Sequence, residues 1–169
     1  PILNKKGQVV DLAMMESRLR LPIAEPAIGE KELSYVTEAI LGGWVSSAGS
    51  FITRFEKLFS EYCGAKYAIA TSSGTTALHL ALESLNITRK DEVIVPTFSF
   101  ISTANAVCYT GARPIFIDSE QDSWNITPEL IEAAITPKTK AIIAVHIYGH
   151  PAKMDAINNI ASKYNLKII

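Results

Sequence analysis

Residues 67–82 have the sequence YAIATSSGTTALHLAL, in which an apolar segment is followed by small polar residues and then by a helical pattern. Tyr67–Thr71 is predicted to form a short strand, and Thr75–Leu85 to form a helix with leucines along one face. A helix that begins directly after a strand can bind an anion, because its first amides lack partners within the helix and the helix dipole is positive there.

The same alternation of apolar segments and helical patterns continues along the chain. Further strands are expected at Glu92–Val95, Arg113–Ile117, Lys140–Val145 and Leu166–Ile169. Helices are expected from Ile28 to the Gly42-Gly43 pair, at Phe51–Tyr62, at Ile101–Thr110, from the Thr127-Pro128 start onward, and at Asp155–Tyr164. Because the strands are continuously apolar, the sequence predicts an α/β fold with a three-layer, mainly parallel sheet.

The composition excludes several classes of protein. The chain has 169 residues, 48% of them hydrophobic, and its 16 Lys and Arg against 17 Asp and Glu give a net charge of −1. This balance provides no electrostatic footprint for nucleic acid or an anionic membrane, and no apolar run approaches the length of a membrane span. Cys63 and Cys108 lack metal-ligand spacing, so we expect reduced, partly buried thiols and no metal. From the composition as a whole we expect a cytoplasmic protein.

Two segments that follow expected strands are candidate binding sites. At the first, Gly74 would let a phosphate approach the backbone, and Ser73, Thr75 and Thr76 would supply hydroxyl donors. The alternative is an ordinary Ser-capped helix, since the segment matches neither the GxGxxG nor the Walker A pattern. At the second, PTFSF at residues 96–100, an aromatic ring could stack on a flat ligand or belong to the core.

A third segment, residues 144–151, has the sequence AVHIYGHP. His146 could hydrogen-bond a ligand or carry a proton, although a lone His is more often structural, and His150 is interpreted as a loop residue. Asp118–Trp124 is interpreted as a solvated acidic loop. Trp44 lies in a segment that either contacts substrate or packs on the surface.

Five segments, taken in order, resemble the motifs of the DegT/DnrJ/EryC1/StrS family of sugar aminotransferases. They are IAEPAIGE at 23–30, GWVSS at 43–47, SGTTALH at 73–79, DEVIVPTF at 91–98 and VHIYGHP at 145–151. Within the family they are most similar to the branch that forms GDP-perosamine. The resemblance implies the fold type I of pyridoxal 5'-phosphate (PLP) enzymes, as in aspartate aminotransferase, with this chain holding an incomplete large domain.

The resemblance also implies a cofactor site. The amides of Gly74 and Thr75, with the Thr75 hydroxyl, would hold the phosphate of PLP, and Phe100 would stack on the pyridine ring. His146 and Tyr148 match a motif at the edge of the sheet, and His146 is taken as a further cofactor contact.

The implied reaction moves an amino group from glutamate to a 4-keto-6-deoxy nucleotide sugar, in a homodimer that serves polysaccharide (O-antigen) biosynthesis. Trp44 and Ser46 would lie near the sugar or the subunit interface. The Asp beside the pyridine nitrogen and the Lys of the Schiff base would follow Ile169, so we expect no catalytic residue here and no transamination by this chain alone. Two alternatives stay open: a pyridoxamine 5'-phosphate (PMP)-dependent sugar dehydratase of the same superfamily, and a non-catalytic ligand-binding module.

Residues 1–20 fall outside this resemblance. Pro1–Leu3 and Val9–Leu12 predict a hairpin that is weakly similar to the closing hairpin of a CBS domain. We therefore expect two parts, a hairpin or linker at 1–20 and the amino-terminal part of an aminotransferase large domain at 21–169.

Overall fold

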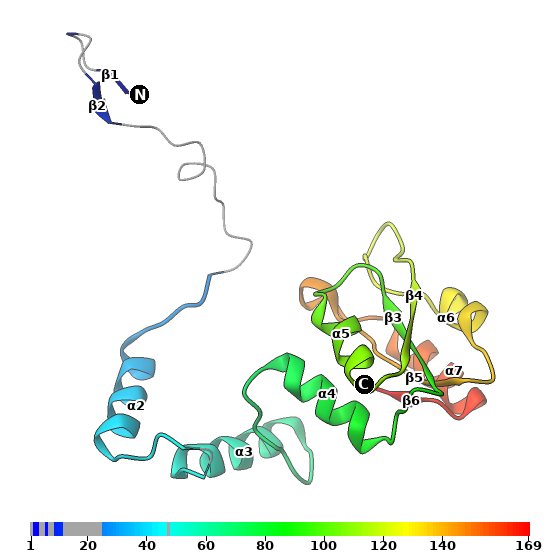
Figure 1. Ribbon diagram of the computed structural model, residues 1–169, viewed down its shortest axis with the longest axis horizontal. Coiled ribbons are helices and arrows are strands. Elements are labelled where there is room, and N and C mark those ends of the chain that lie inside the picture. Colours follow the sequence, from blue (N-terminus) through cyan, green and yellow to red (C-terminus); the bar gives the residue numbers. More distant parts are fainter. Residues whose placement is uncertain (1, 4–5, 7–8, 12–24, 47) are drawn as a thin grey trace. The chain divides into compact units, whose positions relative to one another are not determined.

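The structure is a computed structural model of the chain (Figure 1). The residues that it describes are 2–3, 6, 9–11, 25–46 and 48–169. The chain divides into two compact units, Pro1–Phe55 and Glu56–Ile169.

The second unit is built on a parallel sheet of four strands in the order β4-β3-β5-β6. The strands are β3 (Glu92–Pro96), β4 (Arg113–Ile117), β5 (Thr139–Ile142) and β6 (Lys167–Ile168). Ile94 of β3 aligns with Ile115 of β4 on one side and with Ile142 of β5 on the other. The chain thus reverses its direction of travel across the sheet at β3, and ligands of open parallel sheets bind at such reversals, beyond the carboxyl ends of the strands.

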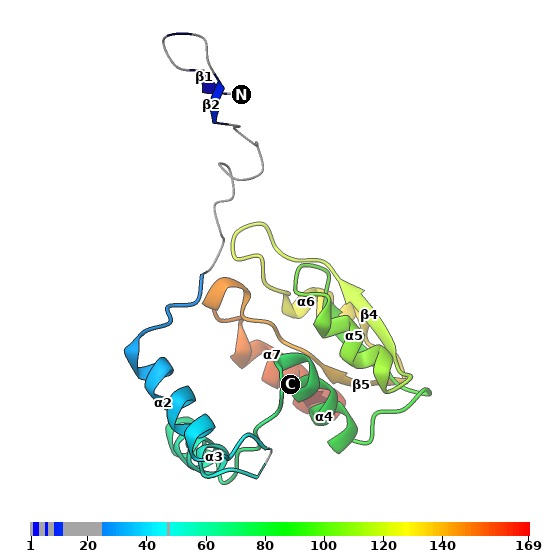
Figure 2. The same cartoon turned by 60° about the vertical axis from the view of Figure 1, so that its left-hand side comes forward.

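Helices cover both faces of this sheet (Figures 1 and 2). The helices are α4 (Gly74–Ser84), α5 (Ser102–Tyr109), α6 (Pro128–Ala134) and α7 (Met154–Tyr164), with a 3-10 turn η1 (Ile147–Gly149) before α7. α4 and α5 pack together against one face, and α6 and α7 pack together against the other. The predicted three-layer α/β arrangement is confirmed.

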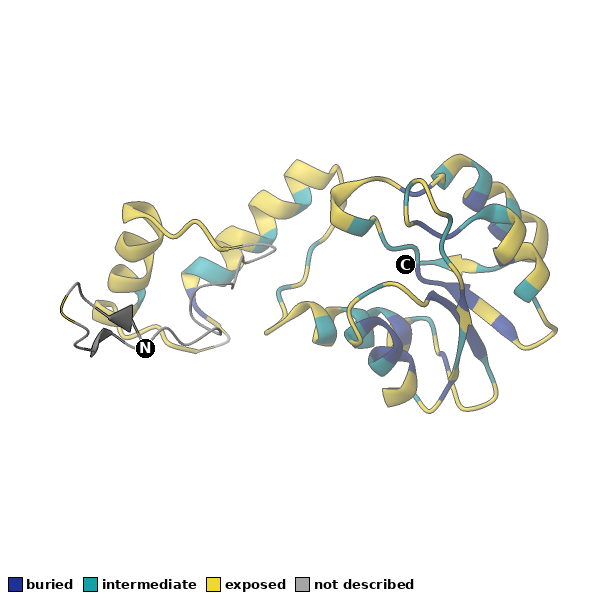
Figure 3. Ribbon diagram, turned by 90° about the horizontal axis from the view of Figure 1, so that it is seen from above, coloured by how far each residue is buried: buried dark blue, intermediate teal, exposed yellow. Residues whose placement is uncertain are grey.

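The middle strand β3 shows why the sheet has two covered faces. All five of its residues are buried, and buried residues gather on the strands of this unit (Figure 3). Val93 and Val95 pack with α4 and α5, whereas Ile94 packs with α6 and α7. Because neighbouring side chains of a strand point to opposite faces, an uninterrupted apolar strand requires a helix layer on each side.

The helix starts follow their capping residues. The Ser73 hydroxyl accepts a hydrogen bond from the Thr76 amide, at 3.3 Å, at the start of α4. The Thr127 hydroxyl accepts one from the Leu130 amide, also at 3.3 Å, with Pro128 in the first turn of α6. These side chains satisfy amides that have no partner within the helix, which explains why each helix begins where it does.

The first unit contains a hairpin and helical segments. β1 (Ile2–Leu3) pairs antiparallel with β2 (Val9–Asp11), as expected, while Pro1 and Leu12 of the predicted hairpin lie outside the described residues. α2 (Glu30–Leu41) ends at Gly42, and α3 (Ser50–Cys63) begins in this unit and ends in the second. The expected boundary near residue 20 falls among residues that the structure does not describe.

The prediction of a strand at Tyr67–Thr71 is wrong. This segment has no strand structure, and Tyr67 and Ile69 are 75% and 72% exposed. A strand exists only through hydrogen bonds to a neighbouring strand, and no strand within the described part of the chain pairs with this segment. One of its amides, that of Ala70, instead donates to the Glu56 carboxylate at 2.9 Å.

Two smaller expectations also need correction. The predicted strand Lys140–Val145 begins one residue earlier and ends at Ile142. The cysteines Cys63 and Cys108 are free, as expected, but exposed rather than partly buried.

None of the helices in the described ranges has the length and apolar character needed to cross a membrane.

A surface contact between α6 and α7 leads to a pH prediction. Glu132 accepts hydrogen bonds from Lys163 Nζ at 2.6 Å and from the Tyr164 hydroxyl at 2.8 Å, and chiefly Lys163 holds the pKa of Glu132 below 4.5. A lowered folded-state pKa stabilises the fold above the ordinary pKa, and this stabilisation is lost as the pH falls through the lowered value. We expect the Tm difference between the unchanged protein and Glu132→Gln to be largest near neutral pH and to disappear well below pH 4.5.

The measurement is thermal unfolding of both proteins across this pH range. Glu61→Gln in α3 is the control, because Glu61 makes no side-chain hydrogen bond among the residues described. Its Tm difference should not vary with pH in this way. A Glu132→Gln difference that is constant from neutral to acidic pH would contradict the prediction.

Candidate functional site

The carboxyl ends of the parallel strands bring three aromatic residues together. Phe98 follows β3, Trp124 follows β4 and Tyr148 follows β5. The Phe98 ring centroid lies 5.3 Å from that of Trp124 and 6.3 Å from that of Tyr148. Since β3 lies between β4 and β5, its loop supplies the middle ring, and we call these three residues the aromatic cluster.

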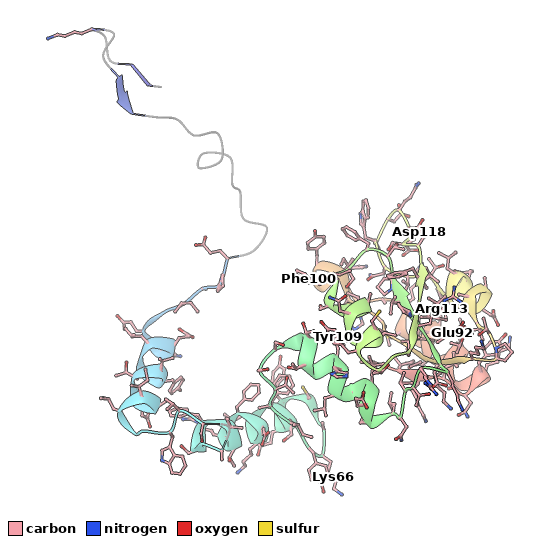
Figure 4. All side chains as sticks on the ribbon, viewed as in Figure 1. Lys66, Glu92, Phe100, Tyr109, Arg113 and Asp118 are labelled. Carbon is pink, nitrogen blue, oxygen red and sulfur yellow. The ribbon has the colours of Figure 1, made fainter. Side chains whose placement is uncertain are left out.

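Figure 4 shows that the two ends of the sheet differ in character. Asp118 and Phe100 lie toward the carboxyl ends of the strands, and Glu92 and Arg113 lie at the opposite, amino ends. Glu92 is buried, accepts a hydrogen bond from the Thr136 hydroxyl at 2.6 Å and lies 3.8 Å from the Arg113 guanidinium. This polar group therefore stabilises the far end of β3 and is separate from the candidate site.

Two members of the aromatic cluster have an unusual backbone conformation. Trp124 has a φ of 60° and Tyr148 a φ of 49°, both in the left-handed region. The other left-handed residues with side chains in the described ranges are Asn86 and Asn165, and asparagine adopts this conformation readily. For a bulky residue the conformation costs about 1–3 kcal/mol, and such strain gathers at functional sites.

Trp124 lines two cavities. One, of about 560 Å³, is lined by Phe98, Trp124 and polar residues that include Asp118 and Glu120. The other, of about 360 Å³, is lined by Trp124, Tyr148 and neighbouring loop residues. Members of the aromatic cluster thus line two cavities at the carboxyl ends of the strands.

The acidic loop 118–124 makes contacts that a freely solvated surface loop would lack. Asp118 and Asp122 are exposed, as expected, but Glu120 is partly buried. The Glu120 carboxylate accepts hydrogen bonds from Lys153 Nζ, at 2.8 Å, and from the Ser123 hydroxyl. Lys153 is the main reason that the pKa of Glu120 is lowered, and Glu120 in turn raises the pKa of Lys153. These contacts tie the loop to the start of α7.

The start of α4 has the features of a phosphate site. Ser73 and Thr76 hydrogen-bond each other in both directions. The Ser73 hydroxyl accepts from the Thr76 amide, and the Thr76 hydroxyl accepts from the Ser73 amide at 3.1 Å. Within the described residues, the Gly74 and Thr75 amides and the Thr75 hydroxyl have no hydrogen-bond partner. A Cβ placed on Gly74 would meet no atom within 4 Å apart from its chain neighbours and the adjacent helix backbone, so the surface beside Gly74 is uncrowded. Of the four residues predicted to contact phosphate, Gly74 and Thr75 remain available, while Ser73 and Thr76 are occupied in the cap.

Phe100 and His146 are both accessible. Phe100 is 88% exposed and projects away from the ribbon, so the core alternative is wrong for it (Figure 4). His146 is exposed, and its Nδ1 accepts a hydrogen bond from the Ala152 amide at 3.2 Å. An imidazole whose Nδ1 accepts carries its proton on Nε2, which leaves an N–H that can donate to a ligand.

The predicted cofactor residues do not bond to one another. No hydrogen bond or ring contact in the described part of the chain links Gly74, Phe100 and His146 to one another. Trp44 and Ser46 belong to the first unit, where both are exposed, and the Ser46 hydroxyl accepts a hydrogen bond from the Ala48 amide at 3.4 Å. No group of three or more His, Cys, Asp or Glu residues in the described ranges is arranged to hold a metal ion.

Asn125 is a residue of the site that the sequence did not reveal. It is 3% exposed, its Oδ1 accepts from the Ile147 amide at 3.1 Å, and its Nδ2 donates to the His150 carbonyl at 3.0 Å. In the sequence it appears only as a polar residue at the end of an acidic loop. Its partners lie 22 and 25 residues away, so no local pattern could have indicated them.

Comparison with known proteins assigns the chain to a family. The model of the DegT/DnrJ/EryC1/StrS aminotransferase family matches residues 26–169. The GDP-perosamine synthases of Caulobacter vibrioides and Escherichia coli O157:H7 are each 47% identical to this chain, over 89% and 88% of its length. The matches cover 40% and 41% of those proteins, so the chain spans about two fifths of the curated relatives that it matches.

Solved structures agree with this assignment. The aminotransferase from Psychrobacter cryohalolentis is 40% identical, with a TM-score of 0.81, over 87% of this chain and 38% of that one. NtdA from Bacillus subtilis, solved with bound PMP, is 43% identical, with a TM-score of 0.76, over 80% of this chain and 31% of that one. The predicted aminotransferase fold, present in part, is therefore confirmed. The chain belongs to the DegT/DnrJ/EryC1/StrS aminotransferase family.

Proposed function

We propose that the protein containing this chain is a PLP-dependent aminotransferase that moves an amino group from glutamate to a 4-keto-6-deoxy nucleotide sugar. The observation that carries this proposal is the start of α4, where the amides of Gly74 and Thr75 have no hydrogen-bond partner among the described residues and the Cβ position of Gly74 is uncrowded. A helix start of this kind suits a phosphate group, and here it occurs in a chain of an aminotransferase family.

The residues of the chain would divide the work of holding cofactor and substrate. Gly74 and Thr75 would bind the phosphate through their amides and the Thr75 hydroxyl, and the exposed ring of Phe100 would cover the pyridine ring. His146 would donate a hydrogen bond from Nε2 to the cofactor or the substrate. When bound, PLP supplies an electron sink for the carbon that gains or loses the amino group.

The remaining parts of the proposal rest on the relatives. Trp44 and Ser46 would contact the nucleotide sugar, and the GDP-perosamine synthases support a GDP-linked sugar as the first substrate to test. We assign the catalytic Lys and the Asp beside the pyridine nitrogen to the part of the relatives that this chain does not span. A cytoplasmic homodimer that serves O-antigen or other polysaccharide biosynthesis completes the proposal.

The proposal is tested with the full-length protein, PLP, glutamate and a panel of 4-keto-6-deoxy nucleotide sugars. We expect one 2-oxoglutarate to form for each amino sugar, measured by a coupled assay and by mass spectrometry of the sugar. Loss of a sugar hydroxyl without amino transfer would instead indicate the dehydratase. PLP binding with no change in any sugar would indicate a binding module, and either outcome would overturn the proposal.

A further inference from the structure

Asn125 connects two loops at the carboxyl ends of the strands. Its backbone belongs to the loop after β4, where its carbonyl accepts from the Glu120 amide at 3.0 Å. Its side chain reaches the loop after β5 through the bonds to Ile147 and His150. Asn125 is nearly fully buried, so its side-chain amide needs these two partners.

The loop that carries Asn125 is itself firmly held. Ser119 and Ile126 form an isolated antiparallel bridge across its base. Within it, the Asn125 amide donates to the Ser123 hydroxyl at 3.3 Å, and Ser123 in turn donates to the Glu120 carboxylate. The ion pair of Glu120 with Lys153 ties the loop to the start of α7. The backbone of Asn125 is therefore held in place, while its side chain bonds to the loop after β5.

The two bonds bracket the strained part of the neighbouring loop. Between Ile147 and His150 lie Tyr148, with a φ of 49°, and Gly149, with a φ of 81°. A left-handed tyrosine persists only where surrounding contacts hold it, and Asn125 supplies one hydrogen bond on each side of it. The His146 bond to the Ala152 amide closes the same loop from its other end.

We propose that Asn125 is a positioning residue, which holds the loop 146–150 in the shape that presents His146 and Tyr148 to the bound cofactor or nucleotide sugar. The proposal rests on the proposed function. It requires both halves of the amide, because Oδ1 accepts from one backbone group and Nδ2 donates to another. Among the described residues, Asn125 makes no hydrogen bond to the side chain of His146 or Tyr148, so it acts on them through the backbone of their loop.

Two variants and a control test the proposal in the full-length protein. Asn125→Ala removes both bonds, and Asn125→Asp keeps an acceptor for Ile147 but cannot donate to the His150 carbonyl when ionised. Asn158→Asp makes the same chemical change at an exposed position of α7. Thermal unfolding of each protein shows whether it is folded, and Asn125→Asp decides the question if Asn125→Ala does not fold.

The first readout is amide hydrogen exchange without cofactor. In Asn125→Ala we expect the segment 146–150 to exchange about tenfold faster or more, while β3 and β5 keep their protection. In Asn125→Asp the Ile147 amide should stay protected. Exchange that rises equally over the whole unit, or nowhere, would overturn the proposal.

The second readout is the affinity for PLP. It is joined by the KM for the sugar in the amino-transfer assay described above. Misplacement of the loop should weaken PLP binding or raise the KM for the sugar by about tenfold or more in both Asn125 variants. Asn158→Asp should change neither value. Unchanged PLP affinity and KM in folded Asn125 variants would contradict the proposal. If the unchanged protein transfers no amino group, the proposed function fails, and exchange together with PLP affinity still decides the role of Asn125.

Discussion

Replacing Gly74 with Asp is expected to weaken PLP binding by about a hundredfold or more, which corresponds to about 2.7 kcal/mol, while α4 becomes no less stable. Gly74 is the first residue of α4, and a Cβ there would meet no atom within 4 Å apart from its chain neighbours and the adjacent helix backbone. An Asp in the first turn of a helix is favoured by the helix dipole and replaces a poor helix former. The same carboxylate would lie in front of the amides that we assign to the phosphate, and would repel it.

The matched control is Gly74→Asn, which has nearly the same size and no charge. We expect it to weaken PLP binding by about tenfold at most, so that the gap between the two variants measures charge repulsion at this helix start. PLP affinity comes from titration followed by absorbance, and helix stability from the Tm of the cofactor-free protein. A raised or unchanged Tm together with lost affinity is the signature of a ligand site. Equal PLP affinity in all three proteins would place the phosphate elsewhere.

Features that depend on neighbouring residues in the chain could be predicted from the sequence. The start of α6 is an example, because Thr127 caps the helix and Pro128 follows in its first turn. β3 is another, since an uninterrupted apolar run already requires cover on both faces. The start of α4 also belongs to this class, because the small polar residues after an apolar segment indicate a Ser-capped helix and Ser73 is its N-cap.

Features that depend on distant partners could not. Tyr67–Thr71 has the composition of a strand, but a strand needs a partner, and none is present in the described residues. The aromatic cluster depends on the order β4-β3-β5, which brings together loops that follow different strands. Asn125 acts through backbone groups of another loop, so its own neighbours in the sequence carry no sign of its role.

The second large effect is expected in the core. Ile94→Ala should lower the free energy of unfolding by about 2–5 kcal/mol, because it removes three buried carbon atoms and leaves a cavity. Ile94 is fully buried at the middle of β3, and its neighbours across the sheet are Ile115 and Ile142. Both sides of the strand are hydrogen-bonded, so the backbone cannot move in to fill the space. Denaturant unfolding of the full-length protein measures the loss.

Two further variants separate this effect from a general sensitivity of the protein. Ile28→Ala, at a position that is 73% exposed, should change the free energy of unfolding by about 0.5 kcal/mol or less. Ile94→Val removes a single methyl group and should cost about 1 kcal/mol.

PLP binding should not follow this loss of stability. Phe98 and Phe100 come directly after β3, and they should keep their positions as long as the strand stays folded. Ile94→Val should therefore bind PLP as tightly as the unchanged protein. A loss of affinity in Ile94→Val would mean that the loop after β3 responds to packing beneath it, and that the candidate site extends into the core.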